Sequence, residues 1–303
     1  MPPPPVAAPA PVASAIGVVA PDVPVVPAAA VPVVPAASAV AVAAAADFAD
    51  VLTEPCGRFP ILRRAWRGLL DLAFPRECAV FGGPVDNPPW RYLSEQALAG
   101  LEPVSAPCCA TCGTPFFGIL DGLQKCPNCE ELHPVFRRGK VAVLAHGPAR
   151  TLVHILKYRQ GVWLAQDIAR IIAATPGFAD FLEGATLVPV PLHPSRQRWR
   201  GYNQSCLLAE HVVRLLPGRG LRVDARLARR VRDTRTQTLL GRTERAQNML
   251  GAFALDAGVK LDKATRYVVF DDVFTTGATL NACCVALAAA GAGRVDVAAF
   301  AHG

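Results

Sequence analysis

The sequence is poor in charged residues and has no positive charge near its beginning. Asp, Glu, Lys and Arg make up 18% of the 303 residues, whereas about a quarter is usual in soluble domains. The first Lys or Arg is Arg58, so the chain lacks the basic segment that opens a secretory signal peptide. In the residues before it, the longest stretch free of Pro and charge, 36–46, is too short to cross a bilayer. We therefore expect neither a signal peptide nor membrane insertion.

Residues 1–46 consist almost entirely of Ala, Val and Pro, with Pro interrupting the apolar runs. This composition is typical of a disordered tail. The alternative is that translation starts downstream, near Asp47, and that the segment is not part of the protein. The next segment, 47–76, contains a predicted amphipathic helix at 60–73, because its apolar residues recur at helical spacing.

The ten cysteines of the chain are not arranged like those of a disulfide scaffold. Four of them form two C-x-x-C pairs, and three others, Cys206, Cys283 and Cys284, lie in apolar helical patterns. This placement indicates a reducing compartment. We therefore expect a cytoplasmic protein.

The two C-x-x-C pairs predict a metal site within the segment 77–135. Each C-x-x-C pair, 109–112 and 126–129, is a short hook. The four thiolates of the two hooks can surround a Zn²⁺ tetrahedrally, and Gly113 after the first hook suits a tight turn. The segment has few periodic runs, so its folding would need help from the metal. A zinc held by four protein sulfurs is structural, while redox-active or simply buried cysteines are the alternatives. The predicted ligands are Cys109, Cys112, Cys126 and Cys129.

The remainder of the chain, 136–303, alternates between strand-like and helix-like patterns. Such alternation predicts an α/β fold, in which a parallel twisted sheet carries helices on both faces. We expect Asn203 or Ser205 to cap the third of the helices. The predicted strands are 139–146, 186–190, 266–270 and 294–300, and the predicted helices are 148–158, 162–174, 203–216 and 278–290.

The positive charge of the chain is concentrated in one segment. From Pro194 to Arg245 there are 13 Arg, no Lys and 4 acidic residues, whereas the whole chain carries a net charge of +7. Such a segment is expected to face a polyanion, and pyrophosphate groups and nucleic acid are the two candidates. Arginines on a solvated surface are the alternative.

An acid pair and a turn with glycine follow the predicted strand 266–270. Asp271 and Asp272 come first, and Thr275–Thr279 lead into the next helix. Open parallel sheets bind ligands at the carboxyl ends of their strands, and the free amides and dipole of a helix N-terminus attract an anion. Gly277 lets the backbone approach this anion, and the threonine hydroxyls can donate to it or cap the helix. The two carboxylates can accept hydrogen bonds from vicinal hydroxyls or lie near Mg²⁺.

The stretch 270–279 resembles the 5-phosphoribosyl-1-pyrophosphate (PRPP) motif of type I phosphoribosyltransferases. The resemblance implies that Asp271 and Asp272 are the catalytic acid pair and bind the ribose 2′ and 3′ hydroxyls. The implied reaction is displacement of pyrophosphate from C1 by a nucleophile, with Mg²⁺. The residues implied to wrap the 5-phosphate are Thr275, Thr276, Gly277, Ala278 and Thr279.

In these enzymes the loop after the strand at 186–190 holds the pyrophosphate, a role that suits the forked guanidinium of arginine. A later polar run, which starts at Arg230 and includes Asn248, is expected to form a mobile lid over the site. The further substrate-binding residues that the resemblance implies are Pro191, Leu192, Arg200, Arg232 and Arg245.

Together the motifs resemble those of the ComF-type competence protein family over about residues 74–302. Members pair a Cys-rich module with a phosphoribosyltransferase domain and are associated with DNA uptake in naturally transformable bacteria. The resemblance implies PRPP or a related sugar phosphate as ligand, and single-stranded DNA and proteins of the competence machinery as partners. The motifs are Pro189-Val190-Pro191-Leu192, Arg200-Gly201-Tyr202-Asn203-Gln204, Lys157-Tyr158, the PRPP loop, and Gln237, Arg245 and Asn248.

The chain departs from the family pattern upstream of the two cysteine pairs. A further C-x-x-C pair commonly opens these proteins. Here Phe81 stands where the cysteine after Cys78 would fall, and Ser94 stands in the place of another. The departure puts a second zinc site in doubt.

Three functions are compatible with these features. An enzyme would transfer the phosphoribosyl group of PRPP to an acceptor that no residue identifies. A DNA-handling factor would use the Arg-rich segment, in which Trp199 and Tyr202 can stack on the bases of a single strand. The alternative is that both aromatic side chains anchor the core. A sensor would bind PRPP or a nucleotide without turnover, because a phosphate pocket does not by itself imply catalysis.

Overall fold

The computed structural model of the chain describes residues 76–116, 125–232, 249, 251–256 and 258–303. The tail 1–46, the helix predicted at 60–73 and Arg245 in the predicted lid lie outside these ranges, so the predictions for them stay as they are. None of the helices within the described ranges has the length and hydropathy that crossing a bilayer requires.

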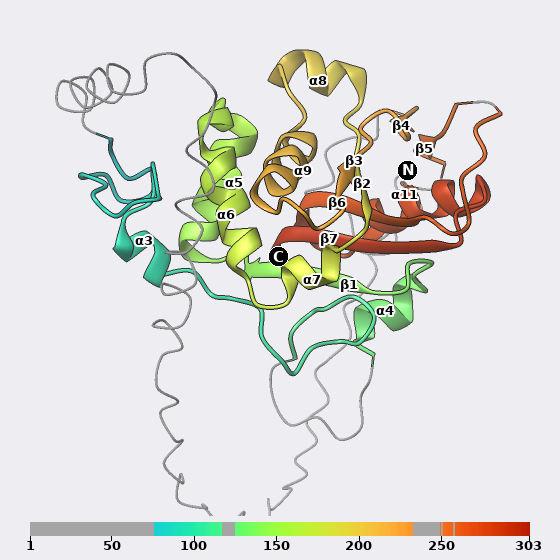
Figure 1. Cartoon of the computed structure of the whole chain (residues 1–303), viewed down its shortest axis with the longest axis horizontal. Coiled ribbons are helices and arrows are strands. Elements are labelled where there is room, and N and C mark those ends of the chain that lie inside the picture. Colours follow the sequence, from blue (N-terminus) through green and yellow to red (C-terminus); the bar gives the residue numbers. More distant parts are fainter. Residues whose placement is uncertain (1–75, 117–124, 233–248, 250, 257) are drawn as a thin grey trace, which may run out of the picture. The chain divides into compact units, whose positions relative to one another are not determined.

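A five-stranded sheet forms the centre of the fold, and all its neighbouring strands are parallel (Figure 1). The strands lie in the order β1-β7-β6-β2-β3, so β6 has a neighbour on either side. The strands are β1 (Gly139–Leu144), β2 (Thr186–Pro189), β3 (Arg222–Val223), β6 (Arg266–Phe274) and β7 (Arg294–His302).

Helices cover both faces of the sheet, which confirms the predicted α/β fold. Along β6, Val268 and Phe270 belong to one buried cluster and Tyr267 and Val269 to another, because successive side chains of a strand point to opposite faces. The first cluster takes in α5 (Gly147–Tyr158), η1 (Gly161–Leu164), α6 (Ala165–Ala174), α7 (Phe178–Leu182) and α9 (Gln204–Leu215), and the second takes in α11 (Ala278–Ala289).

The start of α9 is set by its capping residue. The Asn203 side chain accepts hydrogen bonds from the backbone amides of Ser205 (3.0 Å) and Cys206 (3.4 Å), which have no partner within the helix. Of the two caps considered from the sequence, Asn203 is confirmed. The Ser205 side chain points elsewhere, toward β6.

Most elements match their predicted limits to within two residues, but two differ more. β6 continues through Asp271 and Asp272 to Phe274, although Asp is rare in strands and the strand was predicted to end at Phe270. The helix predicted at 162–174 divides into η1 and α6 at Ala165. The first difference matters for function because it places the acid pair inside the sheet.

Smaller elements surround this framework. A second, antiparallel sheet pairs two short strands, one of which lies within the Arg-rich segment. Two of the short helices lie in the cysteine-rich region, and the third follows β2. These elements are β4 (Arg229–Arg230), β5 (Phe253–Ala254), α3 (Glu95–Ala99), α4 (Pro127–Leu132) and α8 (Pro194–Arg200).

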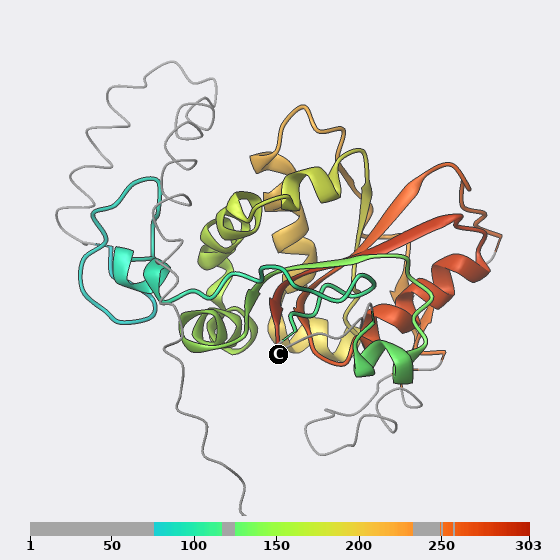
Figure 2. The same ribbon diagram turned by 90° about the horizontal axis from the view of Figure 1, so that it is seen from below.

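The cysteine-rich region packs against both faces of the sheet. Cys78, Leu93 and Ala97 belong to the first buried cluster, together with α5 and α6. The four paired cysteines belong to the second cluster, together with α11, and Figure 2 shows α4 in green beside the red helix α11. The boundary predicted between residues 135 and 136 stays a prediction.

A short segment from the same region covers the edge of the sheet at β1. Pro103 forms an antiparallel bridge with Val143. The Val104 amide donates to the Ala142 carbonyl (3.0 Å), and the Leu144 amide donates to the Glu102 carbonyl (2.8 Å). The segment 102–104 therefore occupies backbone groups of β1 that face away from β7.

Candidate functional site

The acid pair lies near the carboxyl end of β6. Asp271 and Asp272 are buried, although both are acidic. β6 pairs with β2 up to Phe270 and with β7 up to Phe274, so the pair lies just beyond the point where β2 ends. Open α/β sheets bind ligands outside the carboxyl ends of their strands, and the acid pair lies near such an end.

Each carboxylate has its own partner on a different helix. Lys157, in the last turn of α5, places its Nζ 2.9 Å from Oδ2 of Asp272, and the side chains are 23% and 3% exposed. The Ser205 hydroxyl, in the first turn of α9, donates to Oδ1 of Asp271 (2.7 Å). The Asp272 amide donates to the same oxygen (2.9 Å). The two helices therefore hold the acid pair in place from the first-cluster side of the sheet.

The electrostatics of the pair follow from its burial. Burial, and after it the carboxylate of Asp272, raise the pKa of Asp271 from 3.8 to about 7, against the opposing effects of Lys157 and Ser205. Burial acts to lower the pKa of Lys157, but Asp272 and Asp271 outweigh it and raise this pKa. At neutral pH the site can thus take up or release a proton at Asp271.

The turn after β6 has a shape that requires glycine. Gly277 has φ +75°, and a Cβ at this position would lie 2.7 Å from Cζ of Phe274. Gly277 is also the N-cap of α11, whose twelve residues follow directly. The Thr276 hydroxyl accepts a long hydrogen bond from the Ala278 amide (3.4 Å), so this threonine contributes to the start of the helix as predicted. The side chain of Thr275 is exposed.

The loop after β2 reaches the same end of the sheet. The Val190 amide donates to the Phe270 carbonyl (2.9 Å), so Pro191 and Leu192 follow at the level of the acid pair. The Asn203 side chain donates to the Val190 carbonyl (3.0 Å). The structure therefore brings the predicted residues Pro191 and Leu192 to the edge where Asp271 and Asp272 lie.

Arg200 lies beside the end of α5 that carries Lys157. Its Nη1 donates to Gln204 (2.5 Å), and its guanidinium lies 5.7 Å from the ring centre of Tyr158. The Tyr202 hydroxyl donates to the Leu156 carbonyl, which ties the segment after α8 to α5. Arg232, by contrast, lies two residues after β4 and beside Gly251, next to the small second sheet.

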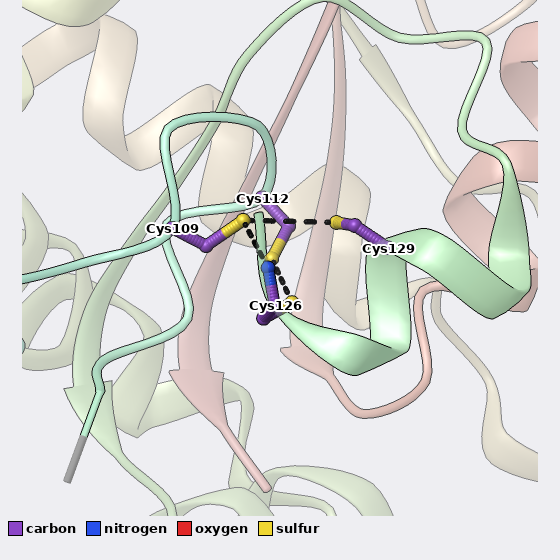
Figure 3. A group of neighbouring side chains, drawn as sticks. All are labelled: Cys109, Cys112, Cys126 and Cys129. Carbon is purple, nitrogen blue, oxygen red and sulfur yellow. Dashed lines mark hydrogen bonds between the residues drawn. The ribbon is translucent and has the colours of Figure 1, made fainter. Parts of the chain in front are cut away.

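The four paired cysteines form the second candidate site. Their sulfurs all lie within 4.8 Å of one another, and Figure 3 shows them converging from the two hooks. The Sγ atoms of Cys109 and Cys129 are 3.9 Å apart, and those of Cys112 and Cys126 are 3.5 Å apart. Zn–S bonds of about 2.3 Å in a tetrahedron give S···S distances of about 3.8 Å. The buried all-sulfur donor set therefore fits a metal such as zinc.

Further contacts join the first hook to the sheet. The Thr114 hydroxyl lies 2.9 Å from Sγ of Cys112 and 2.8 Å from Nε2 of His302. The His302 ring stacks on that of Phe274, with centres 5.5 Å apart and planes inclined by 20°. Burial lowers the pKa of His302, although Cys112 opposes this effect.

The upstream positions that depart from the family pattern also lie together. Cys78 accepts hydrogen bonds at its sulfur from the Ser94 hydroxyl (3.3 Å) and the Ser94 amide (3.5 Å), while the Phe81 side chain is exposed. Among the described residues, no His, Cys, Asp or Glu group that could hold a metal includes Cys78. Cys78 and Ser94 are therefore in contact in the structure, although they lie 16 residues apart in the sequence.

Two residues of the acid-pair site were not assigned a role from the sequence. Lys157 was noted only as part of a motif, and Ser205 only as a possible cap. The signal for Ser205 was its place in the first turn of a helix, which follows a loop predicted to lie at the ligand-binding edge. The partner of Lys157 could not be read from a pattern, because β6 was predicted to end before Asp272.

Comparison with known proteins finds relatives that are 30–32% identical to this chain, while no family model matches it. Competence protein F of Haemophilus influenzae is 32% identical over 183 residues, which cover 58% of this chain and 76% of the relative. DNA utilization protein YhgH of Salmonella typhimurium is 32% identical over 232 residues, which cover 75% of this chain and 96% of the relative. DNA utilization protein YhgH of Escherichia coli K12 is 30% identical over 193 residues, which cover 62% and 81%.

Proposed function

The chain belongs to the ComF-type competence protein family, and from this premise we propose that it binds PRPP or a related ribose phosphate, with Mg²⁺, and serves the handling of imported DNA. The observation that carries the ligand proposal is the acid pair at the end of β6. Asp271 and Asp272 are held by Ser205 and Lys157 directly before the Gly277 turn and α11.

The proposed ligand matches this arrangement group by group. Asp271 and Asp272 would accept hydrogen bonds from the ribose 2′ and 3′ hydroxyls. The free amides at the start of α11 and the hydroxyls of Thr275, Thr276 and Thr279 would bind the 5-phosphate, because a helix N-terminus favours an anion. Pro191 and Leu192 would place the backbone of their loop against the pyrophosphate.

Transfer of the phosphoribosyl group would break the bond between C1 and the pyrophosphate oxygen and form a bond from C1 to an acceptor. The chain would contribute by positioning the ribose and by balancing charge at the end of β6. Arg200, Arg232 and Arg245 would offset the charge of the departing pyrophosphate. Asp271 and Asp272 would supply the carboxylate oxygens that Mg²⁺ prefers, and a Mg²⁺ ion bound with PRPP would lower the negative charge of the pyrophosphate group.

The four cysteines are proposed to hold a structural Zn²⁺. All four ligands would be protein thiolates, which leaves no open position for a substrate. None of the cysteines in the described part of the chain forms a disulfide, and we propose that the protein is located in the reducing cytoplasm. We also propose that residues 77–135 act as a zinc-binding module and residues 136–303 as the phosphoribosyltransferase-like domain.

Single-stranded DNA is a second proposed ligand, and an exposed aromatic side chain favours it. Trp199 is 70% exposed on α8, between Arg198 and Arg200. Exposed aromatic rings among cations bind single strands, because bases stack on the ring and phosphates neutralise the cations. The names of the relatives are consistent with this role, and proteins of the competence machinery would be the further partners.

Isothermal titration with PRPP and Mg²⁺ tests the ligand proposal. We expect the wild-type protein to bind and the double variant Asp271→Asn/Asp272→Asn to lose affinity by roughly a hundredfold or more, because each carboxylate hydrogen bond contributes about 1.5–3 kcal/mol. The matched control Asp86→Asn/Glu95→Gln removes two exposed carboxylates and should bind like wild type. A folded wild-type protein that binds no ribose phosphate would refute the proposal.

Fluorescence anisotropy with a labelled oligonucleotide tests the DNA proposal. Trp199→Ala should weaken binding by about fivefold to a hundredfold, since stacking of one base on an aromatic ring contributes about 1–3 kcal/mol. Phe81→Ala, which removes another exposed aromatic side chain, should leave the affinity unchanged. Equal affinity of Trp199→Ala and wild type at low salt would speak against α8 as the DNA-binding surface.

A further inference from the structure

The helix that carries the second cysteine hook touches the proposed phosphate loop. Asn128 lies on α4 between Cys126 and Cys129, and its Nδ2 donates to the Thr276 carbonyl (3.1 Å). On the next turn, Leu132 places its Cδ2 3.1 Å from where a Cβ on Gly277 would lie. The residues that hold the metal and those that would hold the phosphate are therefore neighbours, although they lie far apart in the sequence.

The hydrogen bond from Asn128 has a consequence for the peptide between Thr276 and Gly277. In a trans peptide the carbonyl and the amide point in opposite directions. Because the Thr276 carbonyl is directed to α4, the Gly277 amide is directed away from α4. Asn128 thus selects one orientation of a backbone amide at the start of α11, where the 5-phosphate is proposed to bind.

The first hook is also connected to the turn between β6 and α11, through a series of side-chain contacts. The Thr114 hydroxyl joins Sγ of Cys112 to Nε2 of His302, and the His302 ring stacks on Phe274. Phe274 in turn fills the space where a side chain on Gly277 would lie. Contacts from both hooks therefore reach the turn between β6 and α11.

α4 is too short to hold its position by its own hydrogen bonds. α4 has six residues, and the side chain of its N-cap, Cys126, makes no capping hydrogen bond. Helices this short are not stable by their own hydrogen bonds, so α4 needs an external anchor. Cys126 and Cys129, at its N-cap and third residue, would supply that anchor through the metal, with Asn128 between them.

We propose that Asn128 is a positioning residue through which metal occupancy of the four-cysteine centre sets the affinity of the loop Thr275–Thr279 for a phosphate. The inference rests on the proposed function for the identity of the ligand, and on the contacts of Asn128 for the coupling. Because coupling between two binding sites is reciprocal, PRPP should also strengthen retention of the metal.

The direct test compares Asn128→Ala with Glu130→Ala, which alters an exposed residue of the same helix. Both variants are loaded with zinc, and their metal content is measured. Asn128→Ala should bind PRPP about threefold to tenfold more weakly than wild type, because one neutral hydrogen bond is lost. Glu130→Ala should bind as wild type does. Equal PRPP affinities of zinc-loaded Asn128→Ala and wild type would overturn the coupling.

A second measurement needs neither a variant nor an active enzyme. Competition with a chelator gives the zinc affinity of the wild-type protein, and saturating PRPP should raise it. Zinc affinity that is unchanged by bound PRPP would count against the coupling, whatever Asn128→Ala does.

Amide hydrogen exchange separates failure of the coupling from failure of the proposed function. In the absence of PRPP, Asn128→Ala should speed exchange at residues 276–279, and Glu130→Ala should not. Faster exchange in a protein that binds no PRPP would uphold the link between the two sites and reject the ligand. Exchange that is the same in Asn128→Ala and wild type would reject the link itself.

Discussion

Lys157 and Asp272 form an ion pair with 2.9 Å between Nζ and Oδ2, inside the fold, where the last turn of α5 meets β6. Charges removed from water are stable only when they are paired. The pair therefore explains how an acidic residue can stand within a central strand.

The first prediction concerns the removal of this cation. Lys157→Met should lower the free energy of unfolding by about 2–4 kcal/mol near neutral pH, since it leaves Asp272 buried without its partner. The expected loss is smaller than for a fully buried ion pair, because Lys157 is partly exposed and solvent screens its charge. Urea denaturation measures the change, with Lys260→Met as the control at an exposed lysine. Similar effects of the two substitutions would show that the ion pair does not stabilise the fold.

The second prediction concerns the pH dependence of stability. The pKa of Asp271 is raised from 3.8 to about 7 in the folded state, so the folded protein holds a proton that the unfolded chain releases. Asp271 therefore makes stability fall as the pH rises from about 4 to about 7. In Asp271→Asn this decline should be absent. Denaturation of both proteins at several pH values in this range measures the difference, and parallel profiles would contradict the prediction.

The third prediction uses two glycines of similar backbone shape. Gly277 and Gly184 have φ values of +75° and +68°, but a Cβ on Gly184 would meet nothing within 4 Å. Gly184→Ala should cost about 1 kcal/mol for the left-handed conformation alone. Gly277→Ala should cost more, by about 1–3 kcal/mol, because the new methyl group overlaps the Phe274 ring. Thermal denaturation ranks the two, and equal costs would mean that Phe274 moves aside freely.

The fourth prediction concerns the metal. Cys112→Ser should lower the zinc content of the purified protein and its unfolding temperature, because one of four ligands is lost and the binding energy of the metal contributes to folding. Cys108→Ser, which alters the neighbouring thiol outside the group of four, should retain one zinc per chain. Metal analysis and calorimetry provide both readouts. Full zinc content in Cys112→Ser would exclude this cysteine as a required ligand.

Most helices and strands of the fold could be predicted from the sequence, because each is determined by a local pattern of residues. The apolar periodicity of α5 and α9 and the apolar runs of β2 and β7 predicted these elements to within two residues. The spacing of the two cysteine hooks likewise predicted the group that the structure brings together. In each case the signal lies within a short stretch of chain.

What the sequence did not reveal are contacts between distant segments. The strand was predicted to end before Asp271 and Asp272, because nothing in the local sequence indicates that these carboxylates have partners. Their partners, Lys157 and Ser205, lie far away in the chain. Asn128 carries no signal of its own, since a polar residue inside a C-x-x-C hook is ordinary. Its role follows only from where α4 lies against α11.

The segment 102–104, which runs along β1, has a further consequence for shortened forms of the protein. An uncovered strand at the border of a sheet is a template for pairing with another molecule. A variant that begins after Val104 would keep both cysteine hooks and the whole parallel sheet, yet it would expose the backbone of β1. We therefore expect such a variant to self-associate through that border, and also to lose the packing of Leu93 and Ala97 in the first cluster.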